Sequence, residues 1–239
     1  MNVGQHGARE ASQHLLERAR STVHRAGGDD LDVSLRPLEG DPAKVLVEAS
    51  ADAVLLVVGT RGRGAIVEAV LGSVAAKCAH HSTVPVAVIG VEGPDAPPTK
   101  IVVGLETSEG SRRALRWALA EAALTGAEVH VVHGWQISEP APDDAGLLEG
   151  PVFTGPTRAV LEGIIAEETK DLSDLSPVTL VAESSPPGEL LVDRAADADL
   201  LVVGSRGHSG LVTLLVGSVS QHCLHHAPCP LIVVAGPHR

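Results

Sequence analysis

An internal repeat constrains the fold of this chain more than any other feature. Shifted by 145 positions, Val33–Gly90 aligns with Val178–Ala235 without a gap, and 24 of those 58 positions are identical. A segment written twice is expected to fold twice in the same way, so the 239 residues predict two copies of one module. We place the first module at residues 1–93 and the second at 99–239, joined by the Pro- and Gly-rich stretch 91–99.

In the second module, short apolar runs alternate with stretches of helical periodicity. The longest helical stretch has Ser108 or Ser111 as its N-cap and Gly126 at its end. Strands are predicted at 100–105, from 128, and at 178–182, 199–204 and 231–235; helices at 108–125, 157–172, 188–196 and from 218; and a mobile loop at 138–155. This alternation indicates an α/β fold with open parallel sheets and right-handed crossovers.

The first module lacks counterparts of the first elements of the second module. Residues 9–26 correspond to the helix after the loop, and nothing corresponds to the strand–helix–strand unit at 100–135. A strand at 32–38 would then lack its neighbour, and unpaired buried backbone groups are costly. We interpret this as a gap filled either by roughly 55 further N-terminal residues or by a partner chain.

A glycine motif recurs within the repeat, as "GTRGRGAIVEAVLGS" from Gly59 and "GSRGHSGLVTLLVGS" from Gly204. Each copy follows an apolar strand and ends at a helix start, which is where open α/β sheets bind ligands. The glycines let the backbone approach a ligand, and Gly-Ser at a helix N-terminus offers N–H groups, a hydroxyl and a positive helix end. We predict a phosphate cradle without lysine, distinct from a Walker loop or G-x-G-x-x-G. The alternative is that the glycines only form turns and that Ser73 and Ser218 are plain helix caps.

Charge and composition exclude several classes of function. The net charge of −12 opposes binding to nucleic acid or anionic membranes, and no apolar run reaches the roughly 20 residues of a membrane span. Three cysteines do not make a disulfide framework, so we expect reduced thiols in a cytoplasmic protein. The recurring C-x-H-H at Cys78 and Cys223 suggests zinc, but adjacent histidines on a helix point about 100° apart, so no metal site is predicted.

The spacing G-x2-G-x9-G-S after an apolar strand resembles the nucleotide-binding signature of the universal stress protein family. "IVVGLETSEGSRRALRWA", "VHVVHGW", "PCPLIVV" and "VPVAVI" are similar to other segments of that family, and the resemblance covers nearly the whole chain. It implies two tandem Rossmann-like domains of the adenine nucleotide alpha hydrolase-like type with strand order 3-2-1-4-5, the first lacking strands 1 and 2. It also implies homodimers formed through the last strand and, in one subgroup, one ATP per domain.

The resemblance also implies which residues bind the nucleotide. In the second module, adenine and ribose would lie near Gly104, Leu105, Glu106 and Gly134, and the phosphates near Val203, Gly204, Arg206, Gly207, Gly217, Ser218, Val219 and Ser220. In the first module only the phosphate half has counterparts, at Gly59, Gly62, Gly72 and Ser73. Glu106 departs from the family, which usually has Asp there.

Three functions follow as hypotheses. The first is a non-enzymatic stress protein that binds ATP, accompanied by Mg²⁺, as a regulatory ligand, with neither nucleic acid nor membrane as partner. The second is a degenerate module that dimerises or docks partners without nucleotide, which Glu106 and the incomplete first module favour. The third is slow ATP hydrolysis, which requires a base and metal ligands that the sequence does not show.

Overall fold

The computed structural model describes residues 3–26, 30–60, 71–90, 96–135, 137–138, 152–153, 158–173, 176–206 and 217–235. The chain divides into two compact units, Met1–Val45 and Leu46–Arg239. The first unit contains helix α1 (Val3–Arg25), which begins six residues before the predicted start at residue 9. Helix α2 (Pro42–Ala49) crosses the boundary between the units.

The predicted strand at 32–38 is wrong. Residues 31–39 form neither helix nor strand. A strand is stable only when its backbone groups pair with a neighbour, and the repeat supplies none at this position. A short apolar run with a proline at Pro37 therefore does not form a strand.

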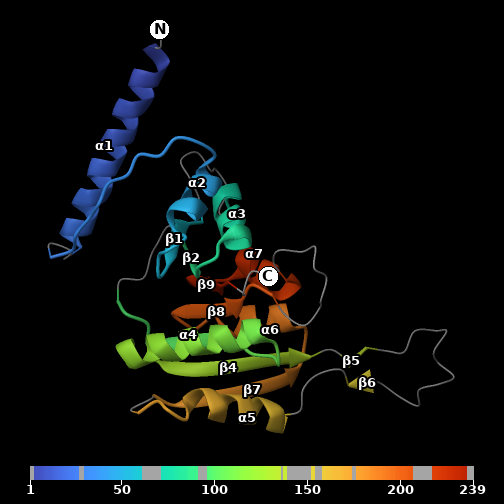
Figure 1. The fold of residues 1–239 in the computed structure, drawn as a ribbon. Helices are drawn as coiled ribbons and strands as arrows, with labels where there is room; N and C mark the ends of the chain where they lie inside the picture. The colour runs from blue at the N-terminus through green and yellow to red at the C-terminus, as the bar shows by residue number, and fades with distance from the viewer. Residues whose placement is uncertain are drawn as a thin grey trace, which may run out of the picture. The chain divides into compact units, whose positions relative to one another are not determined.

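A seven-stranded sheet forms the centre of the second unit, in the order β1-β2-β9-β8-β3-β4-β7 (Figure 1). Its strands are β1 (Leu56–Gly59), β2 (Val86–Ile89), β3 (Lys100–Gly104), β4 (Glu128–Trp135), β7 (Val178–Ser184), β8 (Leu200–Gly204) and β9 (Leu231–Val234). Counted within the second module, the order β7-β4-β3-β8-β9 is strand 3, 2, 1, 4 and 5. Every adjacent pair is parallel except β2 with β9.

The two modules meet where their last strands pair. Ala87 lies opposite its own repeat counterpart Ile232, and Val86 and Val88 flank that pair in antiparallel register with Val233 and Leu231. Equivalent strands that pair in this way are related by a local two-fold axis. Since β2 is flanked by β1 and β9, and β9 by β2 and β8, the edge through which the resemblance implies homodimers is already used within the chain.

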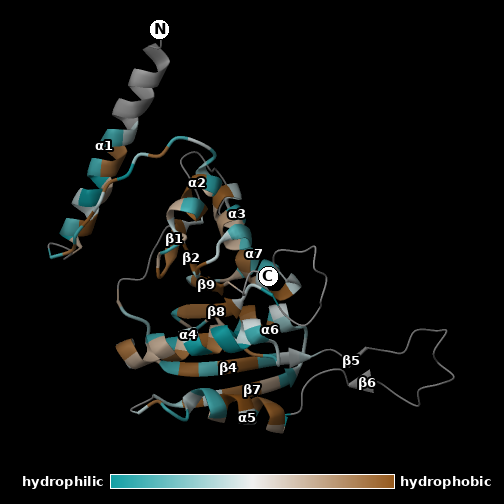
Figure 2. Cartoon of the chain, in the orientation of Figure 1, coloured by the Kyte–Doolittle hydropathy of each residue, from teal (hydrophilic) through white to brown (hydrophobic). Residues whose placement is uncertain are grey.

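Helices cover the second module on both faces. The residues of α4 (Glu109–Thr125) and α5 (Arg158–Thr169) that face the sheet share one aliphatic core cluster with β3, β4 and β8. On the other face, α6 (Pro187–Arg194) packs against α7 (Ser218–His226) and the central strands. The strands are hydrophobic along their length, β8 and β9 most clearly (Figure 2), as expected where both faces of a parallel sheet are buried.

Local sequence signals set the ends of α4. The Ser108 side chain accepts a hydrogen bond from the Ser111 N–H at 3.3 Å, as an N-cap does. At the other end, Gly126 has φ 78°, and its N–H donates to the Ala122 carbonyl at 2.8 Å. Of the two predicted N-caps the structure has Ser108, and the predicted end at Gly126 is confirmed. Ser108 fixes the first turn of α4 beside the end of β3.

Most of the predicted loop at 138–155 lies outside the described residues. Its described ends form β5 (Ile137–Ser138) and β6 (Val152–Phe153), which pair in antiparallel orientation. Helix α3 (Ser73–His81) starts at the end of the first glycine motif, as predicted for both motifs. None of the helices in the described ranges is both long and apolar enough to cross a bilayer.

Candidate functional site

A hollow of about 450 Å³ lies at the carboxyl ends of β3, β4 and β8. Small-molecule sites typically have volumes of this order, and this edge is where open parallel sheets bind ligands. Eleven residues that the resemblance assigned to a nucleotide line this one hollow: Gly104, Leu105, Glu106, Gly134, Val203, Gly204, Arg206, Gly217, Ser218, Val219 and Ser220. Gly207 lies outside the described residues.

The first turn of α7 forms one wall of the hollow. Gly217 is the N-cap of this nine-residue helix, with φ −73° and ψ 161°, and no side chain caps its first turn. The loop before it is closed at its base by the Gly217 N–H, which donates to the Ser205 carbonyl at 2.8 Å. Ser218 is exposed at the first helical position, beside N–H groups that have no acceptor within the helix. This wall can hold an anion through backbone dipoles.

Ser220 lies in the same turn but has a different environment. Its side chain is buried, and its hydroxyl donates to the Gly217 carbonyl at 2.9 Å. The hydroxyl therefore stabilises the turn, and only its lone pairs are left for a ligand donor. Ser218, by contrast, keeps its hydroxyl at the surface of the hollow.

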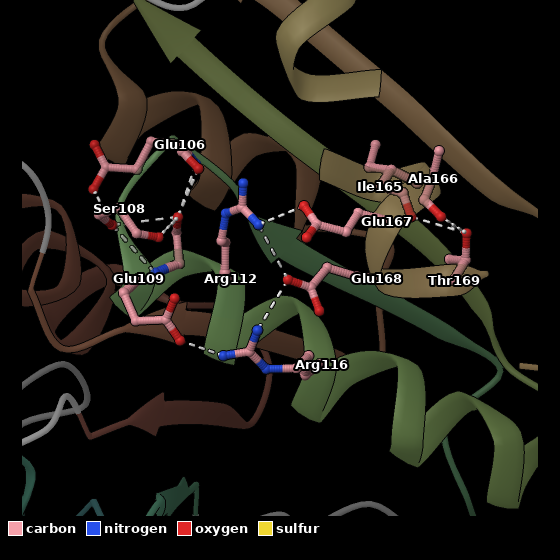
Figure 3. A network of polar contacts seen from close by, with 11 residues as sticks. Glu106, Ser108, Glu109, Arg112, Arg116, Ile165, Ala166, Glu167, Glu168 and Thr169 are labelled. Atoms are coloured by element: carbon pink, nitrogen blue, oxygen red, sulfur yellow. Dashed lines mark hydrogen bonds and ion pairs between the residues drawn. The ribbon is translucent and has the colours of Figure 1, made fainter. Parts of the chain in front are cut away.

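The junction of β3 and α4 forms the opposite wall, where three side chains are tied together (Figure 3). Ser108 Oγ donates to Glu106 Oε1 at 2.8 Å. The Glu106 N–H donates to Ser111 Oγ at 3.1 Å, and Ser111 Oγ donates to the Glu106 carbonyl at 2.8 Å. The carboxylate of Glu106 is thus held at the hollow with acceptor capacity left over.

Ion pairs between α4 and α5 support this wall from behind (Figure 3). Arg112 Nη1 lies 2.9 Å from Glu167 Oε2, and Arg116 Nη1 lies 2.9 Å from Glu168 Oε1. The hydrogen bond from Arg112 holds the pKa of the Glu167 carboxyl below its ordinary value. Arg116 also pairs with Glu109 in the first turn of α4. Exposed pairs contribute little singly, but this network fixes how α4 lies on α5.

Gly204 and Gly134 line the hollow, and packing inside the protein requires glycine at both positions. A Cβ at Gly204 would lie 2.7 Å from the backbone of Gly110, and one at Gly110 would lie 2.4 Å from the Arg206 carbonyl oxygen. A Cβ at Gly134 would lie 2.8 Å from Pro187 Cα. The sequence interpretation assigned Gly204 to the close approach of a ligand. The structure adds a second reason, the direct contact of α4 with the end of β8.

The sequence prediction missed five residues that line the hollow: Ser111, Val132, His133, Pro187 and Leu191. Pro187 and Leu191 belong to α6, whose N-terminus meets the same sheet edge as α7. Because every crossover helix after a parallel strand begins at that edge, the sequence pattern contained a signal for α6. Ser111 lies three residues after the N-cap of α4, a spacing that also places it at the edge.

His133 joins the ends of β3 and β4. Its ring is buried, and Nδ1 lies 2.7 Å from the Leu105 carbonyl oxygen, so Nδ1 carries the proton and donates. Within the described part of the chain, Nε2 of His133 is the one buried side-chain nitrogen or oxygen without a hydrogen-bond partner. This hydrogen bond holds the end of β4 beside the residue that follows β3, and both strand ends line the hollow.

Comparison with known proteins agrees with this geometry. The model of the universal stress protein family matches residues 3–90 and 98–235. A universal stress protein of Mycobacterium tuberculosis is 32% identical over 232 residues, covering 94% of this chain and 77% of the relative. One from Mycolicibacterium smegmatis is 30% identical over 229 residues, with the same coverage. The crystal structure of a universal stress protein from Archaeoglobus fulgidus has a TM-score of 0.69 at 25% identity and covers 98% of this chain and 83% of its own.

The chain belongs to the universal stress protein family. The two segments matched by the family model correspond to the two copies of the repeat. The α/β fold with tandem domains is thereby confirmed, since the sheet contains strands of both copies. The chain spans about three quarters of the length of the relatives named above.

In the first module of this universal stress protein the glycine loop is closed, and the following helix capped, in the same way. The Gly72 N–H closes the loop on the Thr60 carbonyl at 2.6 Å, and Gly72 caps α3 with φ −68° and ψ 147°. Gly59 ends β1 and Ser73 is exposed, while Gly62 lies outside the described residues. Within the described ranges, no strand of this module pairs with β1 on the side where β3 pairs with β8 in the second.

The cysteines of this universal stress protein are poorly suited to reaction. Cys78 and Cys223 are buried, and Cys78, Cys223 and Cys229, all within the described residues, form no disulfide. Burial raises the pKa of the Cys223 thiol to about 12 and that of Cys229 to about 11, so both are protonated at neutral pH. Among the described residues, no group of three or more His, Cys, Asp or Glu side chains could hold a metal ion.

Proposed function

We propose that this universal stress protein binds ATP in its second module as a regulatory ligand of the cytoplasmic stress response. The observation that carries the proposal is the uncapped N-terminus of α7 facing a hollow of nucleotide size. The triphosphate would lie against the first turn of α7 and near Arg206, with Mg²⁺ bound to its oxygens. Adenine and ribose would lie between the end of β3 and the start of α6.

The lining of the hollow supports this orientation. Val132, Pro187 and Leu191 offer apolar surface suited to the faces of a purine. Glu106, bonded to Ser108, keeps a carboxylate oxygen that can accept hydrogen bonds from ribose hydroxyls. Binding of this kind requires neither a nucleophile nor a base, so we propose a ligand site and no hydrolysis.

Two measurements test the proposal on the purified chain. Mass spectrometry of the denatured protein should detect co-purified adenine nucleotide. Saturating ATP should raise the thermal midpoint by about 5 °C, because a ligand present at about 100 times its Kd stabilises the folded state by about 2.7 kcal/mol. If ATP, ADP and AMP at millimolar concentration leave the midpoint unchanged and no nucleotide is extracted, the proposal fails.

A second candidate is a partner-docking module that binds no nucleotide. The observation in its favour is that the carboxylate of Glu106, one methylene longer than the usual Asp, is engaged with Ser108 inside the chain. The same two measurements separate the candidates, because a docking module without nucleotide would show neither extracted nucleotide nor a thermal shift.

A further inference from the structure

Helix α7 carries a pair of histidines that its counterpart α3 lacks. His222 and His226 are one turn apart, and residues at this spacing share one face of a helix. The repeat places Lys77 at the position of His222 and His81 at that of His226, so α3 has only one histidine of the pair. The pair is therefore a feature of the second module that the duplication does not explain.

The two rings lie together on α7. Their centroids are 4.4 Å apart and their planes differ by 23°, so the imidazoles are stacked. The ring of the neighbouring His225 lies 6.3 Å from that of His226, with the two planes at 60°. Adjacent histidines thus point apart, as the sequence indicated, whereas the two that are four residues apart come together.

The first turn of α6 holds the His222 ring in this position. A Cβ at Gly188 would lie 2.9 Å from His222 Cγ and 3.0 Å from its Cδ2, so the ring fits because residue 188 has no side chain. At the corresponding two positions of the first module the repeat has Ala43 and Lys77. The glycine occurs in the module that has the histidine ring, and His222 is half-buried where α6 packs against α7.

A hydrogen bond sets which nitrogen of His226 carries the proton. Nδ1 lies 2.9 Å from the His222 carbonyl oxygen, which can only accept, so Nδ1 donates and Nε2 keeps a lone pair. Histidines that bind metals usually have this arrangement, with one ring nitrogen donating to a carbonyl and the other on the metal. His226 is exposed and is the last residue of α7, where the negative end of the helix dipole favours a cation.

The thiol between the two histidines is not a third ligand. Cys223 is fully buried, and burial raises the pKa of its thiol to about 12. Because metals bind the thiolate, this sulfur stays protonated at neutral pH and does not compete with the imidazoles. The pair therefore offers two nitrogen ligands, fewer than the four of a structural zinc site.

We propose that His222 and His226 chelate a divalent first-row transition-metal ion through one imidazole nitrogen of each, with water completing the coordination. Two histidines at this spacing on one helix face also bind zinc in H-E-x-x-H helices. Imidazole nitrogen suits Cu²⁺, Ni²⁺ and Zn²⁺, and Cu²⁺ should bind most tightly of the three. The bound ion ties the last two turns of α7 together. Its binding requires no nucleotide.

Titration calorimetry with Ni²⁺ and with Cu²⁺ on the purified chain, without nucleotide, tests the proposal. His222→Gln and His226→Gln should each lower the affinity at least about 10-fold, since loss of a mere outer-shell partner already costs that much. Electron paramagnetic resonance of the chain with one equivalent of Cu²⁺ should show coupling to two imidazole nitrogens. Circular dichroism without metal checks that both variants remain folded, and His226→Gln, at an exposed position, is the milder of the two.

The neighbouring histidines supply the matched controls. His225→Gln removes an exposed ring of the same helix, and His81→Gln removes the exposed counterpart of His226 in α3. Both variants should keep the Ni²⁺ affinity within about twofold of the unsubstituted chain.

Three results would overturn the proposal. The first is an affinity for Ni²⁺ and Cu²⁺ that neither His222→Gln nor His226→Gln lowers, including the case in which the unsubstituted chain binds neither ion. The second is an equal loss of affinity in His225→Gln or His81→Gln, which would assign the ion to a different set of histidines. The third is coupling of Cu²⁺ to a single imidazole nitrogen.

Discussion

The same four residues, Leu-Val-Val-Gly, form β1 in one module and the end of β8 in the other. In β8 the residues Leu200–Val203 are all buried, whereas in β1 buried and exposed side chains alternate. The difference comes from sequence far away: β3 and α4 cover β8, whereas among the described strands β1 pairs with β2 alone. Burial of a parallel strand is thus a property of its neighbours rather than of its own sequence.

A second comparison concerns the glycine loops, which both modules have, and the hollow, which involves elements of the second module. Both glycine loops are closed by the same backbone hydrogen bond, and both end at a helix capped by glycine. Only in the second module do the ends of β3 and β4 stand opposite that helix within the described residues. The closed glycine loop with its helix start is therefore a local feature, whereas the hollow requires two distant segments.

The largest effect is expected from placing a charge on each copy of the shared strand. Val202→Asp introduces a carboxylate into the core beside Val103 and should lower the free energy of unfolding by about 4 kcal/mol. Val57→Asp lies at an exposed edge and should change it by less than about 0.5 kcal/mol. Urea unfolding followed by circular dichroism measures both. Equal losses would show that β1 is covered as β8 is.

The second-largest effect is expected from a negative charge at the start of α7, compared with the same charge at the start of α3. Ser218→Asp should weaken ATP binding about 100-fold, or about 2.7 kcal/mol, because the added carboxylate would face the phosphates. The fold should be unharmed, since Ser218 is exposed and an acidic residue at the first helical position favours the helix. Titration calorimetry measures the affinity, and the thermal midpoint without ligand checks the fold.

Ser73→Asp is the matched control for that substitution. Ser73 occupies the same exposed position at the start of α3, in the module without an opposite wall. ATP affinity should therefore stay within about twofold of the unsubstituted protein. An equal loss of affinity in both variants would assign binding to both modules, and no loss in either would remove α7 from the site.

A smaller effect is expected from adding a methyl group to the strand-end glycines. Gly204→Ala would place Cβ 2.7 Å from the backbone of Gly110, and relieving that clash should cost about 2 kcal/mol. Gly59→Ala should cost less than about 0.5 kcal/mol, because Gly59 is exposed and the described residues of its module include no helix like α4. Chemical denaturation of the two variants measures the difference. A costly Gly59→Ala would point to a neighbour on β1.

The parts of the fold that sequence predicted well are those governed by local signals. Helix α4 has its cap at Ser108 and its end at Gly126, both of which act within one turn. The strand wrongly predicted at 32–38 shows the opposite case, since strand formation depends on a neighbour. The antiparallel pairing of β2 with β9 could not be predicted from the hydrophobic pattern of the sequence, because an apolar run does not specify which strand it pairs with.

The residues of the candidate site follow the same rule: those marked by local sequence signals were predicted, and those that depend on packing were missed. The glycine motif and the end of the first strand were recognisable in the sequence, and several described residues of both line one hollow. Leu191 was missed because it lies on the inner face of a short helix, where an apolar residue looks like ordinary core. The role of Gly110 against β8 was missed because it depends on how closely two backbones approach. Assignment of these residues to ATP stays a prediction.

The smallest effect concerns the histidines that end α3 and α7, at the seam between the modules. Burial, the neighbouring His81 and the nearby His225 of the other module lower the pKa of His80 below its ordinary value of 6.5. Below that pH the unfolded chain binds more protons at this position than the folded one, so stability should fall as the pH drops from 6.5. His80→Gln should reduce the slope of stability against pH between about 7 and 5, measured by urea unfolding at each pH. If the slope is unchanged, the pKa of His80 is not lowered in the folded protein.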